Sequence, residues 1–359
     1  MIEDRIARLR SVLPENDLDA LLITQNENRY YLTGFTGSAG VVILTPSQEL
    51  LVVDFRYWEQ AEQEAPRLKI VRQKGRFEDF LPDLLRDHGI RRAGFEAETI
   101  TVSQHDRWQK TLGADITLIP TTNLVENLRA VKDAQEIAKI QAAVDLTDRA
   151  FTHIVERLRP GMTERDIAWD LEVFLRTHGS DGLAFEAIVA AGPNSALPHA
   201  HPTGRPVQSG EPILFDFGAR VDRYCADFSR TVCLGDPSTK LADIFELVQR
   251  AQQTALDGIH GGQPAAEADA LARNVIRDAG HEAHFGHGLG HGLGLFVHES
   301  PRLHWQSDDE LRTGMVVTVE PGVYVPGWGG VRLEDVVVVQ VNTATPLTKS
   351  PKPLALPQS

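Results

Sequence analysis

Four carboxylates placed inside apolar, strand-like segments constrain this 359-residue chain more than any other feature. Asp216 and Asp227 lie in ILFDFGARVDRYCADFSRTVCL, and Glu320 and Glu334 lie in VVTVEPGVYVPGWGGVRLEDVVVV. A buried carboxylate is costly unless a positive group neutralises it. His291, in the glycine-rich run HGLGHGLG, adds an imidazole to these acids. One histidine and four carboxylates together predict a site for two divalent metal ions.

A first hairpin would bring the two aspartates together. Asp216 and Asp227 are symmetric about a point between Val221 and Asp222, where the polar run RVDR favours a turn. If the strands pair about that point, the aspartates face each other with Cβ atoms roughly 5 Å apart. Because directly opposed like charges destabilise a sheet, this arrangement favours a bound cation.

A second hairpin is predicted by the same symmetry. Glu320 and Glu334 lie at equal distances from Gly327, inside the turn-forming sequence PGWGG. All four acids are expected in mid-strand positions among apolar residues. Oxygen-rich ligation with one imidazole suits Mn²⁺, Co²⁺, Fe²⁺ or Zn²⁺, and disfavours a structural zinc site built on thiolates.

Composition and local sequence argue against several classes of protein. The net charge of −14 argues against a nucleic-acid-binding surface. The first residues, MIEDRIARLR, do not form a secretory signal, and no apolar run approaches the roughly 20 residues needed to span a bilayer. We therefore expect a cytoplasmic protein with no membrane partner. Cys225 and Cys233 lack C-x-x-C spacing and are expected to be small, reduced core residues.

The pattern of elements predicts two domains. Short strand and helix patterns alternate over residues 1–120 and predict a mixed α/β domain. In the remainder, Thr163 and Asp166 form a variant capping box at the start of one helix. Further helical patterns lie near 137–158, 239–258 and 264–278. This part is therefore predicted to be α+β, with antiparallel hairpins carrying the acids and helices covering the other face.

Several familiar motifs are excluded. HEAHFGH at 281–287 is not H-E-x-x-H, because Phe285 takes the place of the second histidine, and Arg302 takes it after the HE at 298–299. No dinucleotide-binding glycine loop, phosphate-binding loop or G-x-S-x-G elbow occurs. The glycines around His291 are expected to let backbone approach a crowded metal centre. Three other histidines are predicted to be surface or structural: His281, His284 and His304.

The motifs resemble those of the pita-bread metallopeptidases. The whole chain resembles their proline-specific branch, the Xaa-Pro aminopeptidases and Xaa-Pro dipeptidases (prolidases). The resemblance rests on the five candidate ligands in order, on PHAHPT, GHGLG, VHE, VEPGVY and GGVRLED, and on RYYLTGFTGS at 29–38. It implies a creatinase/prolidase-type N-terminal domain over residues 1–125 and a pita-bread catalytic domain over residues 126–359.

The resemblance also implies a role for each site residue. Two divalent ions, with Mn²⁺ preferred and Co²⁺ or Zn²⁺ as alternatives, would be bound by Asp216, Asp227, His291, Glu320 and Glu334. Asp227 and Glu334 would bridge the two ions. Glu320 would also carry a proton, while His199 and His298 would assist the reaction, His287 would line the site and Arg332 would support the acids.

The predicted activity follows from this resemblance. A hydroxide bridging two metal ions would hydrolyse the Xaa-Pro bond at the N-terminus of short proline-containing peptides, in a homodimer. One alternative is a prolidase restricted to dipeptides, and another is a metal-free pita-bread module that binds peptides or proteins. A methionine aminopeptidase fits less well because it needs no N-terminal domain, and creatinase lacks the metal ligands. Proline specificity comes from the resemblance alone.

Overall fold

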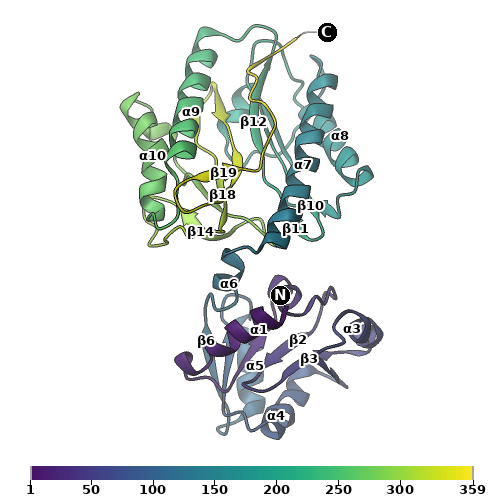
Figure 1. Ribbon diagram of the computed structural model, residues 1–359. Coiled ribbons are helices and arrows are strands. Elements are labelled where there is room, and N and C mark those ends of the chain that lie inside the picture. The colour runs from purple at the N-terminus through teal and green to yellow at the C-terminus, as the bar shows by residue number, and fades with distance from the viewer. Residues whose placement is uncertain (1, 358–359) are drawn as a thin grey trace. The chain divides into compact units, whose positions relative to one another are not determined.

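The computed structural model describes residues 2–357 and divides the chain into two compact units, residues 1–129 and 130–359 (Figure 1). The sequence places the domain boundary after residue 125, whereas the division falls inside the short helix α6 (Glu126–Ala130). Among the described residues, no helix is long and apolar enough to cross a membrane.

A six-stranded sheet forms the centre of the unit of residues 1–129. Its strands are β1 (Ala20–Ile23), β2 (Val41–Leu44), β3 (Glu49–Val53), β4 (Lys69–Arg72), β5 (Arg92–Glu96) and β6 (Thr117–Thr121). They lie in the order β4-β3-β2-β1-β5-β6. Strands β1, β2 and β3 form an antiparallel meander. Strand β4 pairs parallel with β3, β5 pairs parallel with β1, and β6 pairs parallel with β5. This is the mixed α/β domain that the sequence predicts.

Helices pack around this sheet. They are α1 (Ile2–Ser11), α2 (Asn26–Thr33), α3 (Trp58–Glu64), α4 (Phe77–Asp87) and α5 (Val102–Leu112), with single 3₁₀ turns at Pro14–Asn16 and Phe55–Tyr57. The sequence does not predict α2, because its buried face includes the polar residues Asn28 and Arg29 instead of an apolar stripe. The Glu96 carboxylate, at the end of β5, accepts a hydrogen bond from the Asn28 side-chain amide. This bond satisfies part of the hydrogen-bonding capacity of that polar face.

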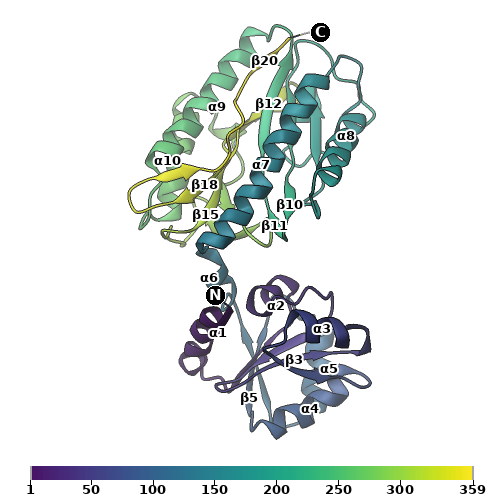
Figure 2. The same cartoon turned by 45° about the vertical axis from the view of Figure 1, so that its right-hand side comes forward.

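Four long helices flank the sheets of the unit of residues 130–359. They form two pairs, α7 (Ala134–Arg157) with α8 (Glu164–Thr177), and α9 (Thr239–Gly258) with α10 (Ala265–Asp278). The pairs lie on either side of the strands in both views (Figures 1 and 2). The predicted capping box of Thr163 and Asp166 is confirmed at the start of α8. The helical patterns and their spacing thus predicted this layer correctly.

Short strands build the sheets between the helix pairs. The first half supplies β7 (Gly182–Leu183), β8 (Ile188–Ala191), β9 (Ile213–Asp216), β10 (Ala219–Val221), β11 (Tyr224–Cys225) and β12 (Ser229–Leu234). The second half supplies β13 (Gly290–Gly292), β14 (Glu299–Leu303), β15 (Val316–Val319), β16 (Gly322–Val325), β17 (Gly329–Arg332), β18 (Asp335–Val339), β19 (Ala344–Pro346) and β20 (Ala355–Leu356). Two 3₁₀ turns lie at Gly192–Ala196 and Glu282–His284.

The sheet order brings distant segments together. One sheet runs β20-β12-β9-β8 and another runs β14-β13-β15-β18-β19, with the smaller sheets β11-β10-β7 and β16-β17 beside them. All pairings in these sheets are antiparallel except that of β12 with β20. The predicted α+β class, with antiparallel hairpins covered by helices, is therefore confirmed.

The predicted register of the first hairpin is wrong by two residues, because the centre of the turn lies one residue further along the chain. Val221 pairs with Tyr224, so Asp216 pairs with Ser229 and does not face Asp227. The turn residues Asp222 and Arg223 both have positive φ, at 48° and 70°. A two-residue hairpin turn with positive φ at both central positions matches the twist of the strands, and a β-branched valine does not fit there. The turn therefore begins after Val221.

The predicted register of the second hairpin is correct. Val325 pairs with Gly329 and Val319 pairs with Asp335, so Gly327 is the centre of symmetry. The two glutamates, however, are not in mid-strand, because Glu320 lies between β15 and β16 and Glu334 lies between β17 and β18. Asp216 ends its strand, and Asp227 lies between β11 and β12. All four acids thus stand where the ladders end or break.

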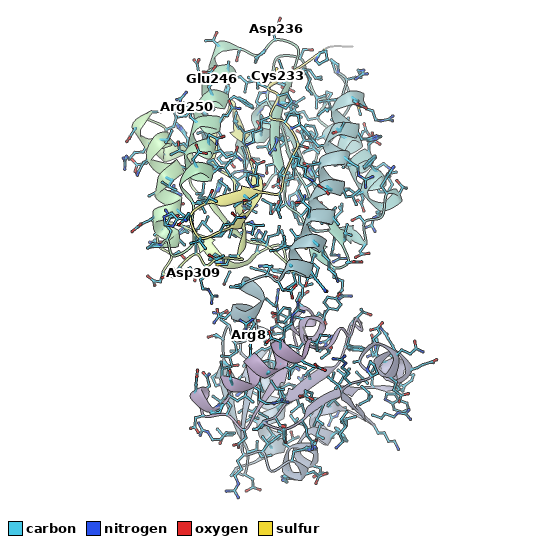
Figure 3. The ribbon with its side chains drawn as sticks, viewed as in Figure 1. Arg8, Cys233, Asp236, Glu246, Arg250 and Asp309 are labelled. Atoms are coloured by element: carbon cyan, nitrogen blue, oxygen red, sulfur yellow. The ribbon has the colours of Figure 1, made fainter. Side chains whose placement is uncertain are left out.

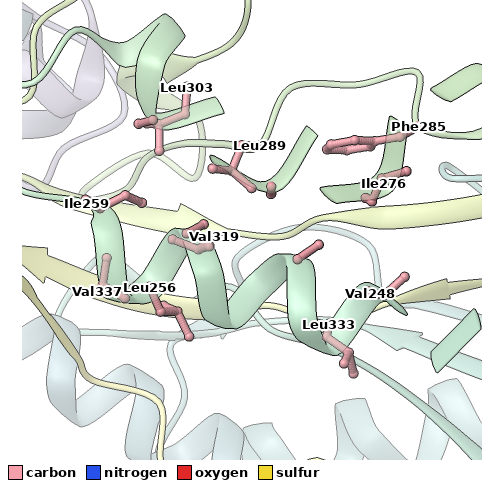
Figure 4. Packing of buried hydrophobic residues seen from close by; sticks show 14 of the residues in the cluster. Val248, Leu256, Ile259, Ile276, Phe285, Leu289, Leu303, Val319, Leu333 and Val337 are labelled. Carbon is pink, nitrogen blue, oxygen red and sulfur yellow. The ribbon is translucent and has the colours of Figure 1, made fainter. Parts of the chain in front are cut away.

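Apolar residues fill the space between helices and strands. In Figure 4, residues of α9 and α10 such as Val248 and Ile276 pack with Val319 and Val337 from the strands and with Leu333, which lies between β17 and β18. The sticks of Figure 3 include Cys233, which is buried in β12. Cys225 and Cys233 are both buried, and neither forms a disulfide within residues 2–357, which confirms the prediction of reduced core cysteines.

Candidate active site

One pocket of about 570 Å³ in the unit of residues 130–359 collects the candidate site residues. Its lining includes all nine of the predicted ones: His199, Asp216, Asp227, His287, His291, His298, Glu320, Arg332 and Glu334. These residues come from segments spread over more than a hundred positions of the chain. Only the tertiary fold brings them to a single cavity.

Three of the acids meet beside Ser229. Asp216 is the ladder partner of Ser229, Asp227 precedes Ser229 by two residues, and the Glu334 N–H donates to the Ser229 carbonyl (3.1 Å). As a result, one carboxylate oxygen from each of Asp216, Asp227 and Glu334 lies within 4.8 Å of the other two. That spacing allows a single cation to contact all three side chains.

His291 and Glu320 complete the set of acids and imidazole. The His291 Nε2 atom lies 3.3 Å from Glu320 Oε1 and 3.5 Å from Asp227 Oδ2. Thr318 ties the His291 backbone to the Glu320 side chain, because its hydroxyl accepts a hydrogen bond from the His291 backbone N–H (3.0 Å) and donates one to Glu320 (3.1 Å). The five predicted ligands therefore lie around one point of the pocket.

Glycines are needed beside His291 because neighbouring strands approach closely. A Cβ at Gly290 would lie 2.0 Å from the Thr318 carbonyl oxygen, and one at Gly292 would lie 2.1 Å from the Ser300 carbonyl oxygen. The predicted close approach is therefore present, although the group approached is the backbone of β14 and β15. On the other flank, Arg273 of α10 donates to the His287 carbonyl (2.7 Å), which anchors the start of this glycine-rich run.

Arg332 links the acids to His287. Its guanidinium forms an ion pair with Asp216 and donates to the Tyr324 hydroxyl (2.9 Å), which is also hydrogen-bonded to His287 Nε2 (2.9 Å). Arg332 Nε also donates to the Ser229 hydroxyl (2.8 Å), and Ser229 in turn donates to Glu334 (2.8 Å). Ser229 belongs to none of the sequence motifs, and Tyr324 is the last residue of VEPGVY, but nothing in that motif assigns a role to the tyrosine.

The remaining histidines lie at the more exposed part of the pocket. The His298 ring makes an edge contact with the His291 ring, with centroids 4.5 Å apart. His199 lies in the loop that follows the 3₁₀ turn Gly192–Ala196. His304 also lines the pocket, although the sequence predicts it to be a surface or structural residue. It stacks on Trp305, with centroids 3.7 Å apart.

Burial sets the electrostatics of the site. Loss of hydration raises the pKa of Asp227 and of Glu334 well above the usual carboxyl range, and neighbouring acids act in the same direction. Burial also raises the pKa of Asp216 and of Glu320, although Arg332 opposes the shift. The four buried carboxylates therefore have too little positive charge near them.

The same loss of hydration acts on the imidazoles and the phenol. It lowers the pKa of His287 to about 3 and that of His298 to about 4, and it lowers the pKa of His291. It raises the pKa of Tyr324 to about 12. At neutral pH these groups are neutral, so the imidazoles can bind a metal or donate an N–H without carrying charge.

The donor set fits divalent cations. Asp216 Oδ1 and Glu334 Oε1 are buried and have no hydrogen-bond partner among residues 2–357, although buried carboxylate oxygens are normally paired. Arg332 supplies one positive charge against four carboxylates. Two divalent ions held by Asp216, Asp227, His291, Glu320 and Glu334 would occupy the open oxygen positions and offset the remaining charge.

Comparison with known proteins agrees with this fold and pocket. Residues 138–340 match the model of metallopeptidase family M24, and residues 5–131 match the creatinase/prolidase N-terminal domain. The chain therefore belongs to metallopeptidase family M24, with a creatinase/prolidase-type N-terminal domain and a pita-bread catalytic domain. Members of this family use divalent metal ions, so the chain is an enzyme of the metallopeptidase class.

Individual relatives identify the branch of the family. The Xaa-Pro dipeptidase of Pyrococcus horikoshii is 32% identical, over 99% of both chains. The structure of an Xaa-Pro dipeptidase from Bacillus anthracis superposes with a TM-score of 0.96 at 40% identity, covering 99% of this chain and 100% of that one. An X-Pro aminopeptidase from Thermotoga maritima has a TM-score of 0.88 at 37% identity, covering 94% and 98%. The resemblance to the proline-specific pita-bread metallopeptidases is thereby confirmed.

Proposed function

We propose that this protein hydrolyses the bond between an N-terminal residue and a following proline in short peptides. The observation that carries the proposal is the gathering of five candidate metal ligands and four further candidate residues around one pocket. Similarity over nearly the full length to proteins described as Xaa-Pro dipeptidases and an X-Pro aminopeptidase supports the choice of substrate.

The five ligands would hold two divalent ions, with Mn²⁺ as the preferred metal. When bound, such ions polarise a carbonyl oxygen and lower the pKa of a coordinated water. Glu320 would take a proton from the attacking water and pass it toward the imide nitrogen of proline, a general acid–base role. Burial raises the pKa of the Glu320 carboxyl, which makes it a stronger base than an exposed glutamate and suits this exchange.

Two neutral imidazoles would act on the substrate carbonyl. The lowered pKa of His298 keeps its ring neutral, so one ring N–H can donate to the oxygen on which negative charge develops. His199, which also lines the pocket, would donate to the same oxygen. Removing a donor of this type commonly costs about 10²- to 10³-fold in turnover. Arg332 and Tyr324 would fix His287 and Asp216 and would not react.

The pocket also offers an apolar surface. Phe185, Ile188 and Pro198 are among its lining residues, and a pyrrolidine ring could pack against them. Proline has no N–H at the scissile imide, so this wall needs no acceptor for it. This surface supports a proline-containing substrate.

A narrower candidate is a dipeptidase that accepts only Xaa-Pro dipeptides. The similarity to the Xaa-Pro dipeptidase of Bacillus anthracis favours it. Incubation of the protein with Mn²⁺ and with Xaa-Pro dipeptides, Xaa-Pro tripeptides and Met-Ala separates the candidates. Hydrolysis of dipeptides and tripeptides supports the broader exopeptidase, and hydrolysis of dipeptides alone supports the dipeptidase. Cleavage of Met-Ala in preference to both would refute proline specificity.

Metal analysis separates the enzyme from a metal-free binding module. About two divalent ions per chain in active protein supports the proposal. Activity in protein stripped of metal, or no binding of divalent ions at all, would refute the role of the five ligands. We also propose a homodimer in the cytoplasm, which sedimentation of the purified protein and fractionation of the source cells would test.

A further inference from the structure

Both ends of the loop that carries His199 meet one buried carboxylate. We define the His199 loop as residues 192–203, between β8 and the segment that leads to β9. At its start, the Ala191 N–H and the Asn194 side-chain amide donate to Glu164 Oε1, at 2.8 and 2.9 Å, and the same amide reaches Oε2 at 3.1 Å. At its end, the N–H and the hydroxyl of Thr203 donate to Oε2, at 2.9 and 2.5 Å.

The Glu164 carboxylate binds the two ends of this loop by hydrogen bonds. Its side chain is fully buried, with 0% of its surface exposed, and every hydrogen bond that it accepts comes from residues 191–203. A buried carboxylate is tolerated when several donors satisfy it, and here five hydrogen bonds do so. Glu164 is also the first residue of α8, where a negative side chain interacts favourably with the helix dipole.

The His199 side chain depends on the loop backbone for its position. The ring is exposed, and among residues 2–357 no hydrogen bond holds it. Other parts of the loop are tied to the strands, because the Ser195 hydroxyl accepts the Gly330 N–H (2.8 Å). On the N-terminal side of His199, Arg332 donates to the Pro198 carbonyl (3.4 Å), and on the other side Ala200 is buried. Beyond Ala200, the segment is held at Thr203 by Glu164, so this contact contributes to where the imidazole lies.

We propose that Glu164 is a positioning residue that acts through His199. It does not line the pocket and does not touch the substrate. Its carboxylate would close the loop so that the His199 N–H reaches the carbonyl oxygen under attack. This inference rests on the proposed function for its catalytic consequence, but the effect on the loop can be measured without any substrate.

Glu164→Gln is the decisive variant. It keeps the size of the side chain but replaces one acceptor oxygen with an amide donor that faces the donors of Asn194 or Thr203. Hydrogen exchange should become faster, by roughly tenfold or more, in peptides from the His199 loop and stay unchanged in α9 and α10. Unchanged exchange in the loop would overturn the inference whether or not the protein hydrolyses any peptide. If Glu164→Gln does not fold, Thr203→Val, which removes one donor, gives the same measurement with a smaller expected change.

A double-mutant cycle tests the route through His199. In the Mn²⁺-loaded enzyme acting on an Xaa-Pro dipeptide, Glu164→Gln should lower kcat by roughly 10- to 100-fold and leave KM within about twofold. In a His199→Ala background the same substitution should change kcat by less than about twofold. An equal loss in both backgrounds would mean that Glu164 only stabilises the fold. Failure of the wild-type enzyme on every Xaa-Pro peptide would refute the proposed function instead, and the exchange experiment would still decide the positioning role.

Glu172→Gln is the matched control. Glu172 lies on the same helix and carries the same side chain, but it pairs with Arg176 at the surface. This variant should keep wild-type exchange in the His199 loop and wild-type kcat. A loss of kcat equal to that of Glu164→Gln would show that any change of charge on α8 disturbs the enzyme, which would contradict the specific role of Glu164.

Discussion

The tight approach of strand β13 to its neighbours makes Gly290→Ala a sharp test of the site. The added Cβ would lie 2.0 Å from the Thr318 carbonyl oxygen, whereas side-chain Cβ atoms essentially never approach closer than 3.0 Å. The difference, 3.0 − 2.0 Å, means that β13 must move away from Thr318 by about 1 Å. Overpacking of this kind typically costs about 1–3 kcal/mol of folding stability.

The same movement should damage the metal centre. His291 follows Gly290, and Thr318 holds both His291 and Glu320 by hydrogen bonds. Displacing reacting groups by about 1 Å can cost about 10²-fold in rate. We therefore expect Gly290→Ala to lower kcat/KM for an Xaa-Pro dipeptide by about 10²-fold and to weaken binding of one of the two metal ions. Steady-state kinetics with excess Mn²⁺ and metal analysis after dialysis measure the two effects.

Gly286→Ala, immediately before the same glycine-rich run, provides the control. No atom lies within 4 Å of a Cβ at Gly286, and its backbone is not in the left-handed region, so the substitution should leave activity and stability near wild type. Wild-type activity and metal content in Gly290→Ala would refute the claim that His291 depends on this close approach. Equal losses in both variants would refute it as well, because the effect would then not arise from contact with Thr318.

Three further results are expected. Asp227→Asn should abolish hydrolysis and reduce the metal content, since the carboxylate is expected to bridge both ions; full activity after metal exchange would contradict that role. His298→Ala should lower kcat by about 10²-fold with normal metal content, and loss of metal would instead make His298 a ligand. In metal-free protein, the raised pKa values of Asp227 and Glu334 mean that folding favours their protonated forms. Stability should therefore fall as pH rises above the unfolded carboxyl pKa of about 4 toward the raised folded values, while Mn²⁺ at about 1,000 times its Kd should restore about 4 kcal/mol. Thermal denaturation between pH 4 and 8 with and without Mn²⁺ measures this, and a metal-free protein that is most stable at pH 8 would contradict it.

Sequence patterns predicted a large part of the catalytic unit because local signals decide those features. The capping box at Thr163 begins a helix through contacts with the next three residues, and the PGWGG turn sets the register of the second hairpin. The first hairpin shows the limit of such reasoning. Its turn contains no glycine, and the positive φ at Asp222 and Arg223 follows from strand twist, so symmetry counted from the two aspartates places the centre of the turn one residue too early.

By itself, the sequence determined the set of candidate metal ligands and their order, because acids in apolar segments carry an electrostatic cost that few other arrangements relieve. Only the tertiary structure decided which neutral and charged groups hold that set. Ser229, Tyr324 and Thr318 bond to site residues, and Glu164 holds the His199 loop from a neighbouring helix. Serine, threonine and glutamate are common throughout the chain, and the hydrogen bonds made by these residues and by Tyr324 join residues far apart in it. Such contacts produce no periodic pattern in the sequence, so they can be recognised only in the folded structure.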